Sequence, residues 1–185
     1  MKRILEILAS ACGLIASSPL ILILIPVIRL NSPGPAIFRQ ERVGKRQRNF
    51  TCYKLRTMAE GTKQLGTHEV GAASVTSVGR FLRKTKLDEL PQLWNVLCGE
   101  MSLVGPRPCL PGQAELIEER EKRGVFEVLP GITGLGQVRG IDMSVPDRLA
   151  KCDEEYVQRQ SLKLDLQLLL QTILGAGRED RVQES

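Results

Sequence analysis

Histidine and aromatic residues are scarce in this sequence. Its 185 residues include one histidine, and aromatic side chains make up 4% of the total. Structural zinc sites are built from clustered cysteine and histidine ligands, so the lone His68, in a polar stretch where it is expected to be inert, argues against zinc. Proteins that bind single-stranded nucleic acid stack the bases on aromatic side chains, so the low aromatic content argues against that class of partner.

The cysteines form no recognisable pattern either. There are five, an odd number, spread from Cys12 to Cys152 without a C-x-x-C pair. A small secreted domain held by disulfides has an even set of cysteines, so we expect reduced thiols on the cytoplasmic side of a membrane. Hydrophobic residues make up 42% and charged residues 25%. This is ordinary globular composition, which excludes a disordered, collagenous or coiled-coil chain, and the length suits one domain.

Charge is missing from one long segment near the N-terminus. The 22 residues from Ile7 to Ile28 contain no charged side chain, and as a straight helix they would measure ~33 Å. That length matches the roughly 30 Å hydrocarbon core of a bilayer. A cleavable signal peptide would have a shorter apolar core and a small-x-small cleavage site, whereas this run ends at Arg29 without one. We therefore expect the segment to stay in the membrane.

Two topologies are open for this segment. Pro19, preceded by Ser17 and Ser18, removes a helix hydrogen bond in the middle of the run. The arms at 4–17 and 20–28 would be roughly 21 Å and 14 Å long, each too short to cross a bilayer alone. Basic residues lie at both ends, and a plain span would leave one set on the outer side. A re-entrant helix–break–helix is favoured, with the serine hydroxyls bonding the freed backbone groups.

The rest of the sequence predicts a helix-rich domain with a few short strands. Strands are expected at 36–38 and 50–55, around a basic turn that contains Gly44. The polar, glycine-rich stretch 60–75 indicates a loop, and so do the four glycines of 130–140. Helices are expected at 78–98, 113–123, 144–160 and 162–174, the third with Ser144 and Asp147 at capping-box spacing.

The densest group of chemically active side chains is Asp88-Glu89, close to the cations Arg83 and Lys86. One interpretation is structural, because Thr85 and Asp88 have capping-box spacing and acidic residues in a first turn complement the helix dipole. The other is that Arg83 and the helix N-terminus receive a phosphate, which a divalent ion joins to the carboxylate. The residues alone leave both interpretations open.

Three further segments are candidates for ligand contacts. Arg107 lies between two prolines that fix its backbone, which suits a guanidinium held for bidentate phosphate contact; a rigid surface turn is the alternative. Lys54 and Arg56 share one face of a strand, which by itself is typical of a solvated face. The glycines of 130–137 would let a loop approach a ligand through its backbone.

Together these segments resemble the bacterial sugar transferase family of small monotopic polyprenyl-phosphate phosphoglycosyltransferases. The resemblance covers residues 2–174 and rests on seven short motifs in order: Ser18-Pro19, Ser32-Pro33-Gly34-Pro35, Lys54-Leu55-Arg56-Thr57-Met58, Gly79-Arg80-Phe81-Leu82-Arg83, Leu87-Asp88-Glu89-Leu90-Pro91-Gln92, Val104-Gly105-Pro106-Arg107-Pro108 and Pro130-Gly131-Ile132-Thr133-Gly134. Each motif is unspecific alone, but the ordered set is very specific. The departures from the family pattern, Leu55 for Phe, Lys86 for Ser and Glu100 for Asp, remove no proposed chemical group.

The resemblance implies a reaction. Family members move a phosphosugar from a UDP-sugar to polyprenyl (undecaprenyl) phosphate at the cytoplasmic face of the membrane. By that pattern Asp88 and Glu89 form the catalytic dyad and bind Mg²⁺. Asp88 attacks the sugar-proximal phosphorus, UMP leaves, and the lipid phosphate then attacks the aspartyl-phosphosugar intermediate. Glu89 supports the metal or handles a proton, and Lys54, Arg83 and Arg107 are the cations expected around the phosphates.

The expected fold is α-rich α+β. It consists of a re-entrant membrane hairpin at 1–30 that breaks at Ser18-Pro19, a compact cytoplasmic catalytic domain at 31–175 with interfacial amphipathic helices, and a charged tail at 176–185. The expected partners are a UDP-sugar, polyprenyl phosphate and membrane lipids, without nucleic acid, at the bacterial inner membrane in polysaccharide or lipopolysaccharide assembly. A membrane-anchored basic binding or scaffold protein is the alternative, favoured by the cations of 39–48. The sugar, the polyprenyl length and homo-oligomer formation stay open.

Overall fold

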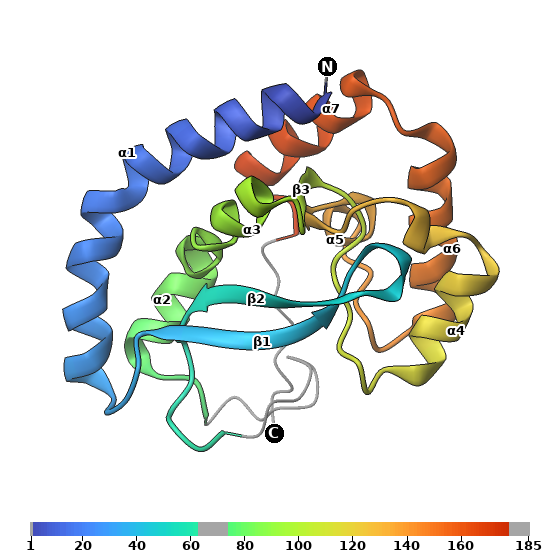
Figure 1. The fold of residues 1–185 in the computed structure, drawn as a ribbon. Helices are drawn as coiled ribbons and strands as arrows, with labels where there is room; N and C mark the ends of the chain where they lie inside the picture. Colours follow the sequence, from blue (N-terminus) through green and yellow to red (C-terminus); the bar gives the residue numbers. More distant parts are fainter. Residues whose placement is uncertain (1, 63–73, 178–185) are drawn as a thin grey trace.

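The computed structural model describes residues 2–62 and 74–177, so His68 and most of the expected loop at 60–75 lie outside the described residues. The architecture is the expected one, rich in helix with a few short strands (Figure 1). The helices, strands and 3-10 turns (η) are, in chain order, α1 (Lys2–Asn31), β1 (Ile37–Val43), η1 (Lys45–Gln47), β2 (Asn49–Leu55), α2 (Ser77–Thr85), η4 (Leu87–Glu89), α3 (Gln92–Cys98), β3 (Ser102–Val104), α4 (Ala114–Lys122), η5 (Val125–Glu127), β4 (Gly131–Thr133), α5 (Leu135–Val138), α6 (Pro146–Arg159) and α7 (Leu162–Ile173).

The N-terminal segment is one helix of 30 residues, α1, so the expected break at Ser18-Pro19 is wrong as a helix boundary. Pro19 has no N–H to donate to the carbonyl of Ile15. The Ser18 hydroxyl donates to that carbonyl at 2.8 Å, which is the role expected for the serines. Because the lost bond is replaced, α1 bends and continues (Figure 1). The helix is long and apolar enough to cross a membrane.

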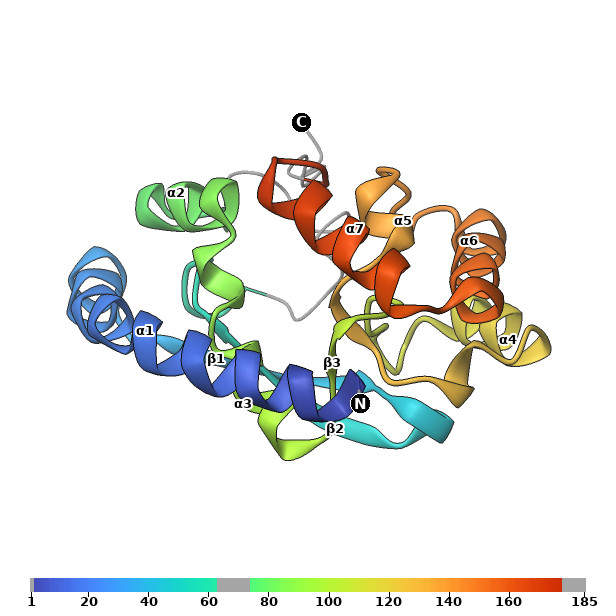
Figure 2. The ribbon, with the colours of Figure 1, turned by 90° about the horizontal axis from the view of Figure 1, so that it is seen from above.

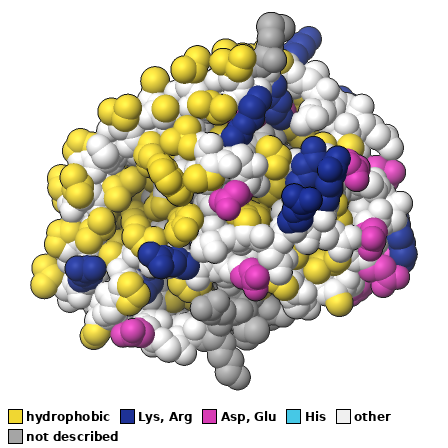
Figure 3. All heavy atoms as spheres, in the orientation of Figure 1, with side chains coloured by type: hydrophobic (Ala, Val, Ile, Leu, Met, Phe, Trp, Pro, Cys, Tyr) yellow, Lys and Arg dark blue, Asp and Glu magenta, His cyan; other side chains and the backbone are white. Residues whose placement is uncertain are grey.

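Both halves of α1 pack on the same domain. Leu24 and Ile28, in the second half, are buried in a core cluster with Leu55 and Leu82. In the first half, the buried Glu6 accepts a hydrogen bond from the hydroxyl of a serine in β3. Large apolar side chains of α1 that stay exposed are Ile4, Leu5, Ile7, Leu8, Ile15, Leu20, Leu22, Ile23, Val27 and Leu30. Figure 3 shows hydrophobic side chains along the arc of α1, while acidic ones gather over α4 and α6 on the other side.

The two strands expected after the membrane segment are confirmed. β1 and β2 form an antiparallel hairpin that pairs Ile37 with Leu55 and Val43 with Asn49. The first strand is longer than expected, because its pairing continues to Val43. The inner residues Cys52 and Leu55 are buried. β2 packs against η4 and α3, so the hairpin brings the cations of β2 to the segment that holds Asp88-Glu89.

The single helix expected at 78–98 is wrong, since the segment forms α2, η4 and α3. Lys86 has a φ of 59°, a left-handed conformation that ends α2. Pro91 then precedes α3 as its N-cap residue, a place where its missing N–H breaks no helix bond. These two breaks place Asp88-Glu89 on a tight turn instead of a helix face. Seen from above, the segment that links α2 to α3 lies between α1 and α7 (Figure 2).

The loop expected at 130–140 is also wrong. Its first part is the strand β4, which pairs in parallel with β3, and α5 follows. The glycines here approach the protein's own backbone. A Cβ on Gly131 would lie 2.1 Å from the amide nitrogen of Gly105, and a Cβ on Gly134 would lie 2.1 Å from the Gly105 carbonyl oxygen. Two glycine motifs of the sequence therefore meet because neither carries a side chain at the contact.

The helices expected at 113–123, 144–160 and 162–174 are confirmed as α4, α6 and α7, and all five cysteines are free. The capping box at the start of α6 is wrong, because the Ser144 hydroxyl bonds Asp142 and Asp147 accepts from Lys151. α7 is amphipathic, with Leu168 and Asp165 buried. Its large exposed apolar residues recur at helical spacing: Leu162, Leu166, Leu170 and Ile173.

Candidate active site

The acidic pair Asp88-Glu89 lies on the 3-10 turn η4. Both side chains are buried, with 7% and 8% of the residue surface exposed. The capping box expected from Thr85 and Asp88 is wrong. The Thr85 hydroxyl donates backwards to the carbonyls of Phe81 and Leu82 in α2, and no side chain caps η4. Both carboxylates do lie in the first turn of η4, as the structural interpretation has it.

Glu89 is held by two cations that come from distant parts of the chain. Its Oε1 accepts from Lys54 Nζ of β2 at 3.1 Å and from Arg107 Nη2 at 2.9 Å. Burial opposes ionisation of this carboxyl, but Lys54, Arg107 and then Lys86 outweigh it and hold the pKa of Glu89 far below its usual range. Glu89 is therefore ionised at any physiological pH. It fixes two of the three cations expected around the phosphates.

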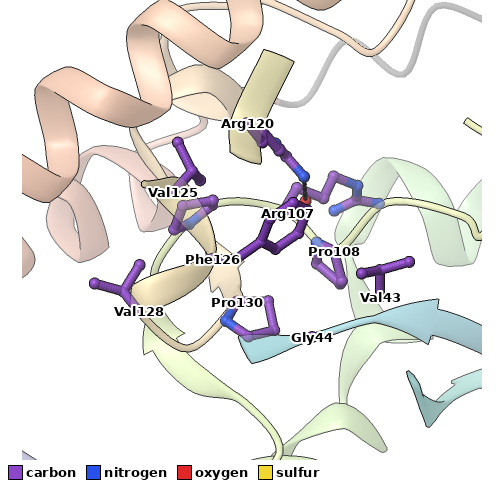
Figure 4. A pocket seen from close by; sticks show the side chains of 10 residues that line it. Val43, Gly44, Arg107, Pro108, Arg120, Val125, Phe126, Val128 and Pro130 are labelled. Atoms are coloured by element: carbon purple, nitrogen blue, oxygen red, sulfur yellow. Dashed lines mark hydrogen bonds between the residues drawn. The ribbon is translucent and has the colours of Figure 1, made fainter. Parts of the chain in front are cut away.

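The backbone at Arg107 is fixed by hydrogen bonds as well as by the two flanking prolines. Arg120 Nη1 donates to the main-chain oxygen of Arg107 at 2.9 Å, the contact drawn in Figure 4. Arg42 Nη1 of β1 donates to the next carbonyl, that of Pro108, at 2.9 Å. Arg120 is itself fixed by a buried ion pair with Asp153 of α6 at 2.6 Å. Three elements thus set the direction of the Arg107 guanidinium.

Arg83, at the end of α2, carries a buried donor that has no hydrogen-bond partner among the described residues. Its Nε donates to Thr57 Oγ1 at 2.9 Å, but its Nη1 bonds nothing in the described part of the chain. Gly79 allows this placement, because a Cβ there would lie 1.9 Å from the Thr57 carbonyl oxygen. A buried guanidinium N–H without an acceptor is rare and strongly destabilising. Phosphate and carboxylate oxygens are the acceptors that a guanidinium N–H bonds most strongly.

The structure thus brings together Lys54, Glu89 and Arg107, and it places Asp88 beside Glu89 on η4 and Arg83 on the helix that leads into it. Ser18 and Pro19 lie on an exposed part of α1, where Ser18 serves the helix backbone. Arg56, which shares a strand face with Lys54 in the sequence, turns away to the carbonyls of Ser32 and Pro33. It belongs to the support of the turn after α1.

A magnesium ion fits this site in one arrangement. Among the described residues no group of three or more Asp, Glu, His or Cys side chains converges. Mg²⁺ in phosphoryl-transfer sites is often bound by one or two carboxylates, with substrate phosphates and water as further ligands. Asp88 and Glu89 meet that requirement. Lys54 and Arg107 already neutralise Glu89 Oε1.

Several residues that build the site carry no signal of their own in the sequence. Arg42 looks like one of many basic residues of 39–48, yet burial and then Arg107 lower its pKa to about 10. Arg120 and Asp153 look like ordinary surface charges of two helices, yet each is 2% exposed. Gln92 is likewise 2% exposed, and its Nε2 has no hydrogen-bond partner among the described residues. Its place in the motif after the dyad was the one available signal.

Nearly the whole chain is similar to a known protein family. Residues 1–178 match the protein family described as bacterial sugar transferase. The chain is 40% identical over 181 residues to the UDP-glucose:undecaprenyl-phosphate glucose-1-phosphate transferase of Caulobacter vibrioides, which covers 93% of this chain and 68% of that protein.

Two other relatives have similar identity but different lengths. The chain is 39% identical over 185 residues to the uncharacterized sugar transferase EpsL of Bacillus subtilis, covering 100% of this chain and 91% of that protein. It is 39% identical over 183 residues to the UDP-N-acetylgalactosamine-undecaprenyl-phosphate N-acetylgalactosaminephosphotransferase of Aeromonas hydrophila, covering 94% of this chain and 43% of the relative. The match to the third protein thus spans less than half of its length.

Proposed function

Because the chain belongs to the bacterial sugar transferase family and is a phosphoglycosyltransferase, we propose that it transfers a phosphosugar from a UDP-sugar to polyprenyl phosphate. The family match over residues 1–178 confirms the resemblance seen in the sequence. The proposed products are polyprenyl-diphosphate-sugar and UMP. Undecaprenyl phosphate is the acceptor named for both characterised relatives, and it is the acceptor we propose here, in the initiation of bacterial glycoconjugate assembly.

Asp88 is the proposed nucleophile. One of its carboxylate oxygens forms a bond to the sugar-proximal phosphorus, while the bond from that phosphorus to the bridging oxygen breaks and UMP leaves with the electron pair. An oxygen of polyprenyl phosphate then attacks the same phosphorus, and the Asp88 carboxylate leaves. Two displacements through a covalent intermediate replace one direct reaction between two phosphate anions. Glu89, Lys54 and Arg107 keep the positive charge next to this phosphorus.

The observation that carries this proposal is the buried Arg83 Nη1, unpartnered in the described part of the chain, on the helix that leads into a buried carboxylate dyad. A guanidinium forms its strongest hydrogen bonds with phosphate and carboxylate oxygens. We assign this donor to a phosphate of the UDP-sugar. Arg83 would then bind the donor in both the ground state and the transition state, while Lys54 and Arg107 act beside Glu89.

Mg²⁺ is the proposed cofactor, with Asp88 as its main protein ligand and Glu89 as the second. When bound, it would reduce the negative charge of the diphosphate and so favour approach of a carboxylate. The chain's own contribution is to keep Glu89 ionised through two cations, to fix Arg107 through its carbonyl, and to bury the dyad away from bulk water.

We propose that α1 enters and leaves the membrane on the cytoplasmic side. Lys2 Nζ pairs with Asp165 of α7 at 2.8 Å, and Asn31 at the other end donates to Ser77 Oγ of α2 at 3.1 Å. Both ends of the helix are thus fixed to one domain, which a helix crossing a bilayer would not allow. The exposed apolar faces of α1 and α7 would seat the domain at the level of the acceptor phosphate.

Intact-mass spectrometry tests the covalent reaction. The purified protein in detergent is incubated with Mg²⁺ and each of a panel of UDP-sugars, without a lipid acceptor. We expect a mass increase of one phosphosugar with at least one donor, and no increase in Asp88→Asn. Glu118→Gln, an exposed carboxylate of α4, is the matched control and should form the adduct.

Two other results would contradict the proposal at different points. Unchanged mass together with UMP release that needs the lipid would indicate direct transfer in a ternary complex and would reject the covalent role of Asp88. No UMP release from any sugar nucleotide, with lipid present, would reject the transferase reaction and favour the binding or scaffold alternative.

A further inference from the structure

A cavity of about 150 Å³ adjoins the dyad on the side of α7. Lys86 and Glu89 line one end of it, and Leu90, Leu93 and Ile132 form an apolar wall. The opposite wall is the C-terminal part of α7 and the turn after it, including Thr172 and Ala176. The cavity is thus charged where it meets η4 and apolar over most of its length.

The polar groups of its walls are mostly engaged within the protein. Thr133 Oγ1 and Thr172 Oγ1 bond each other at 2.6 Å, and the Thr172 hydroxyl also donates to the Leu168 carbonyl at 2.8 Å. Gln137 Nε2 donates to the Ile132 carbonyl at 2.8 Å, which leaves its Oε1 without a partner among the described residues. A hexose has several hydroxyls that each need a partner when buried, and the two threonine hydroxyls of this wall are already engaged with each other.

The surroundings of the cavity are apolar surface of the kind that faces lipid. Leu93 extends from α3 to α1, where a Cβ on Gly13 would lie 3.2 Å from Leu93 Cδ1. On the other side, Leu170 and Ile173 of α7 are 59% and 70% exposed. The cavity is therefore flanked by α3, which packs on α1, and by α7, and Glu89 of the dyad lines it.

We propose that this cavity receives the isoprene unit next to the phosphate of the polyprenyl acceptor, so that the lipid reaches Asp88 between α3 and α7. This inference rests on the proposed function. The cavity is lined mainly by apolar side chains, which suits the hydrocarbon of an isoprene unit. Lys86, at the charged end, is placed to bind the acceptor phosphate.

The distribution of charge favours a prenyl phosphate over an ordinary phospholipid. In a prenyl phosphate the hydrocarbon begins at the atom bonded to the phosphate oxygen. A glycerophospholipid has a polar glycerol ester at that place. Leu90 and Leu93 line the same cavity as Glu89 and Lys86, and the Thr133 and Thr172 hydroxyls of its lining already bond each other. Glycerol ester oxygens would be buried here without donors.

The test fills the cavity and measures the two half-reactions separately. In Leu93→Trp we expect the KM for polyprenyl phosphate to rise about tenfold or more, since even one methylene in an apolar pocket changes specificity by about tenfold. Formation of the phosphosugar adduct without acceptor should stay within about twofold of the parent rate. Leu97→Trp, one turn further along α3 and not lining the cavity, is the control and should leave both values unchanged. Ala176→Phe fills the cavity from the opposite wall and replaces Leu93→Trp if that variant does not fold.

A second readout does not depend on catalysis. A polyprenyl phosphate analogue with a photoreactive diazirine in its first isoprene unit should label peptides that contain residues 90–93 or 172–177, in the parent and in Asp88→Asn. Labelling elsewhere would overturn the inference even if the enzyme is active.

Slower adduct formation in Leu93→Trp, with an unchanged KM for polyprenyl phosphate, would overturn the inference and assign the cavity to the UDP-sugar. Gln137 Oε1 would then accept a hydrogen bond from a hydroxyl of the UDP-sugar. Loss of all UMP release in the parent would reject the proposed function, while the labelling result would still decide the lipid site.

Discussion

Arg120 Nη1 donates to the main-chain oxygen of Arg107 at 2.9 Å, and the same guanidinium forms a buried ion pair with Asp153. This contact links α4 and α6 to a residue that binds the dyad. The Arg107 side chain reaches Glu89 at 2.9 Å, so a charge pair between α4 and α6 helps to set the position of a cation in the candidate site. Arg120 and Asp153 are positioning residues, since the bond to Arg107 is through its backbone.

The first prediction separates the stability of this pair from its positioning role. Asp153→Asn leaves the Arg120 charge buried without a counter-charge, so we expect the free energy of unfolding to fall by about 3–5 kcal/mol. The double variant Arg120→Met/Asp153→Leu replaces the pair by apolar side chains and should regain most of that loss. It should still show a reduced kcat, because the Arg107 carbonyl has lost its donor. Urea unfolding in detergent and UMP-release kinetics measure the two effects; full activity of the double variant would contradict the positioning role.

The second prediction concerns the pH dependence of stability. Glutamate in an unfolded chain titrates near pH 4.3, and the folded pKa of Glu89 lies far below that value because Lys54 and Arg107 outweigh its burial. Between the two values the unfolded state binds one proton more than the folded state. The stabilisation from Glu89 is therefore complete above about pH 4.3 and decreases as the pH falls towards the folded pKa.

Removing the carboxylate should flatten this dependence. We expect unfolding free energies measured from pH 5.5 down to pH 3 to fall less steeply in Glu89→Gln than in the parent, by up to about 1.4 kcal/mol per pH unit below pH 4.3. Glu118→Gln, an exposed carboxylate, should keep the parent slope. Identical slopes for the parent and Glu89→Gln would mean that the two cations do not hold this carboxylate ionised.

The third prediction concerns Arg83. Arg83→Met removes the buried donor assigned to a phosphate, and a hydrogen bond to a charged group contributes about 1.5–3 kcal/mol. We expect kcat/KM for the UDP-sugar to fall by about ten- to a hundredfold, with the KM for polyprenyl phosphate little changed. Arg80→Met, an exposed arginine one turn earlier on α2, is the control and should remain active. An equal loss in both variants would indicate a general effect of charge and not a phosphate contact.

Local sequence motifs predict which chemical groups belong to the candidate site, but not how these groups are arranged. The motifs single out Asp88, Glu89, Lys54, Arg83 and Arg107. Of these, Lys54, Glu89 and Arg107 form one ion-pair cluster. Local signals could not reveal Arg120 and Asp153, because a buried ion pair between two helices looks like two surface charges until the helices pack.

The errors in secondary structure have a common physical origin. Apolar spacing at 78–98 is compatible with one helix, but Lys86 in a left-handed conformation and Pro91 divide it, and tertiary contacts with β2 decide where. At 130–134 the glycines suggested a loop near a ligand. Gly131 and Gly134 are needed instead for close contact with Gly105, which lies 26 and 29 positions earlier in the chain. In α1, Pro19 predicts a break, but the Ser18 hydroxyl replaces the missing hydrogen bond to the Ile15 carbonyl and the helix continues.

The fourth prediction concerns the topology of α1. With the native cysteines replaced, single cysteines in Lys2→Cys and Pro35→Cys should react with a membrane-impermeant maleimide in inside-out vesicles and stay unlabelled in intact cells. The reason is that both ends of α1 are fixed to one domain, by Arg3 donating to the Val96 carbonyl and by Asn31 donating to Ser77, and Lys2→Cys leaves both contacts in place. Reaction of the two positions on opposite sides would restore the plain transmembrane span.

The fifth prediction uses a glycine contact to move Arg83 without changing its charge. A Cβ on Gly79 would lie 1.9 Å from the Thr57 carbonyl oxygen, so Gly79→Ala must push α2 away from the end of β2. We expect the free energy of unfolding to fall by about 1–3 kcal/mol, and the KM for the UDP-sugar to rise because Arg83 loses its bond to Thr57. Gly112→Ala, where a Cβ would meet nothing within 4 Å, is the matched control and should be as stable as the parent or slightly more stable. If Gly79→Ala binds the donor as well as Gly112→Ala does, the placement of Arg83 against Thr57 does not matter for the reaction.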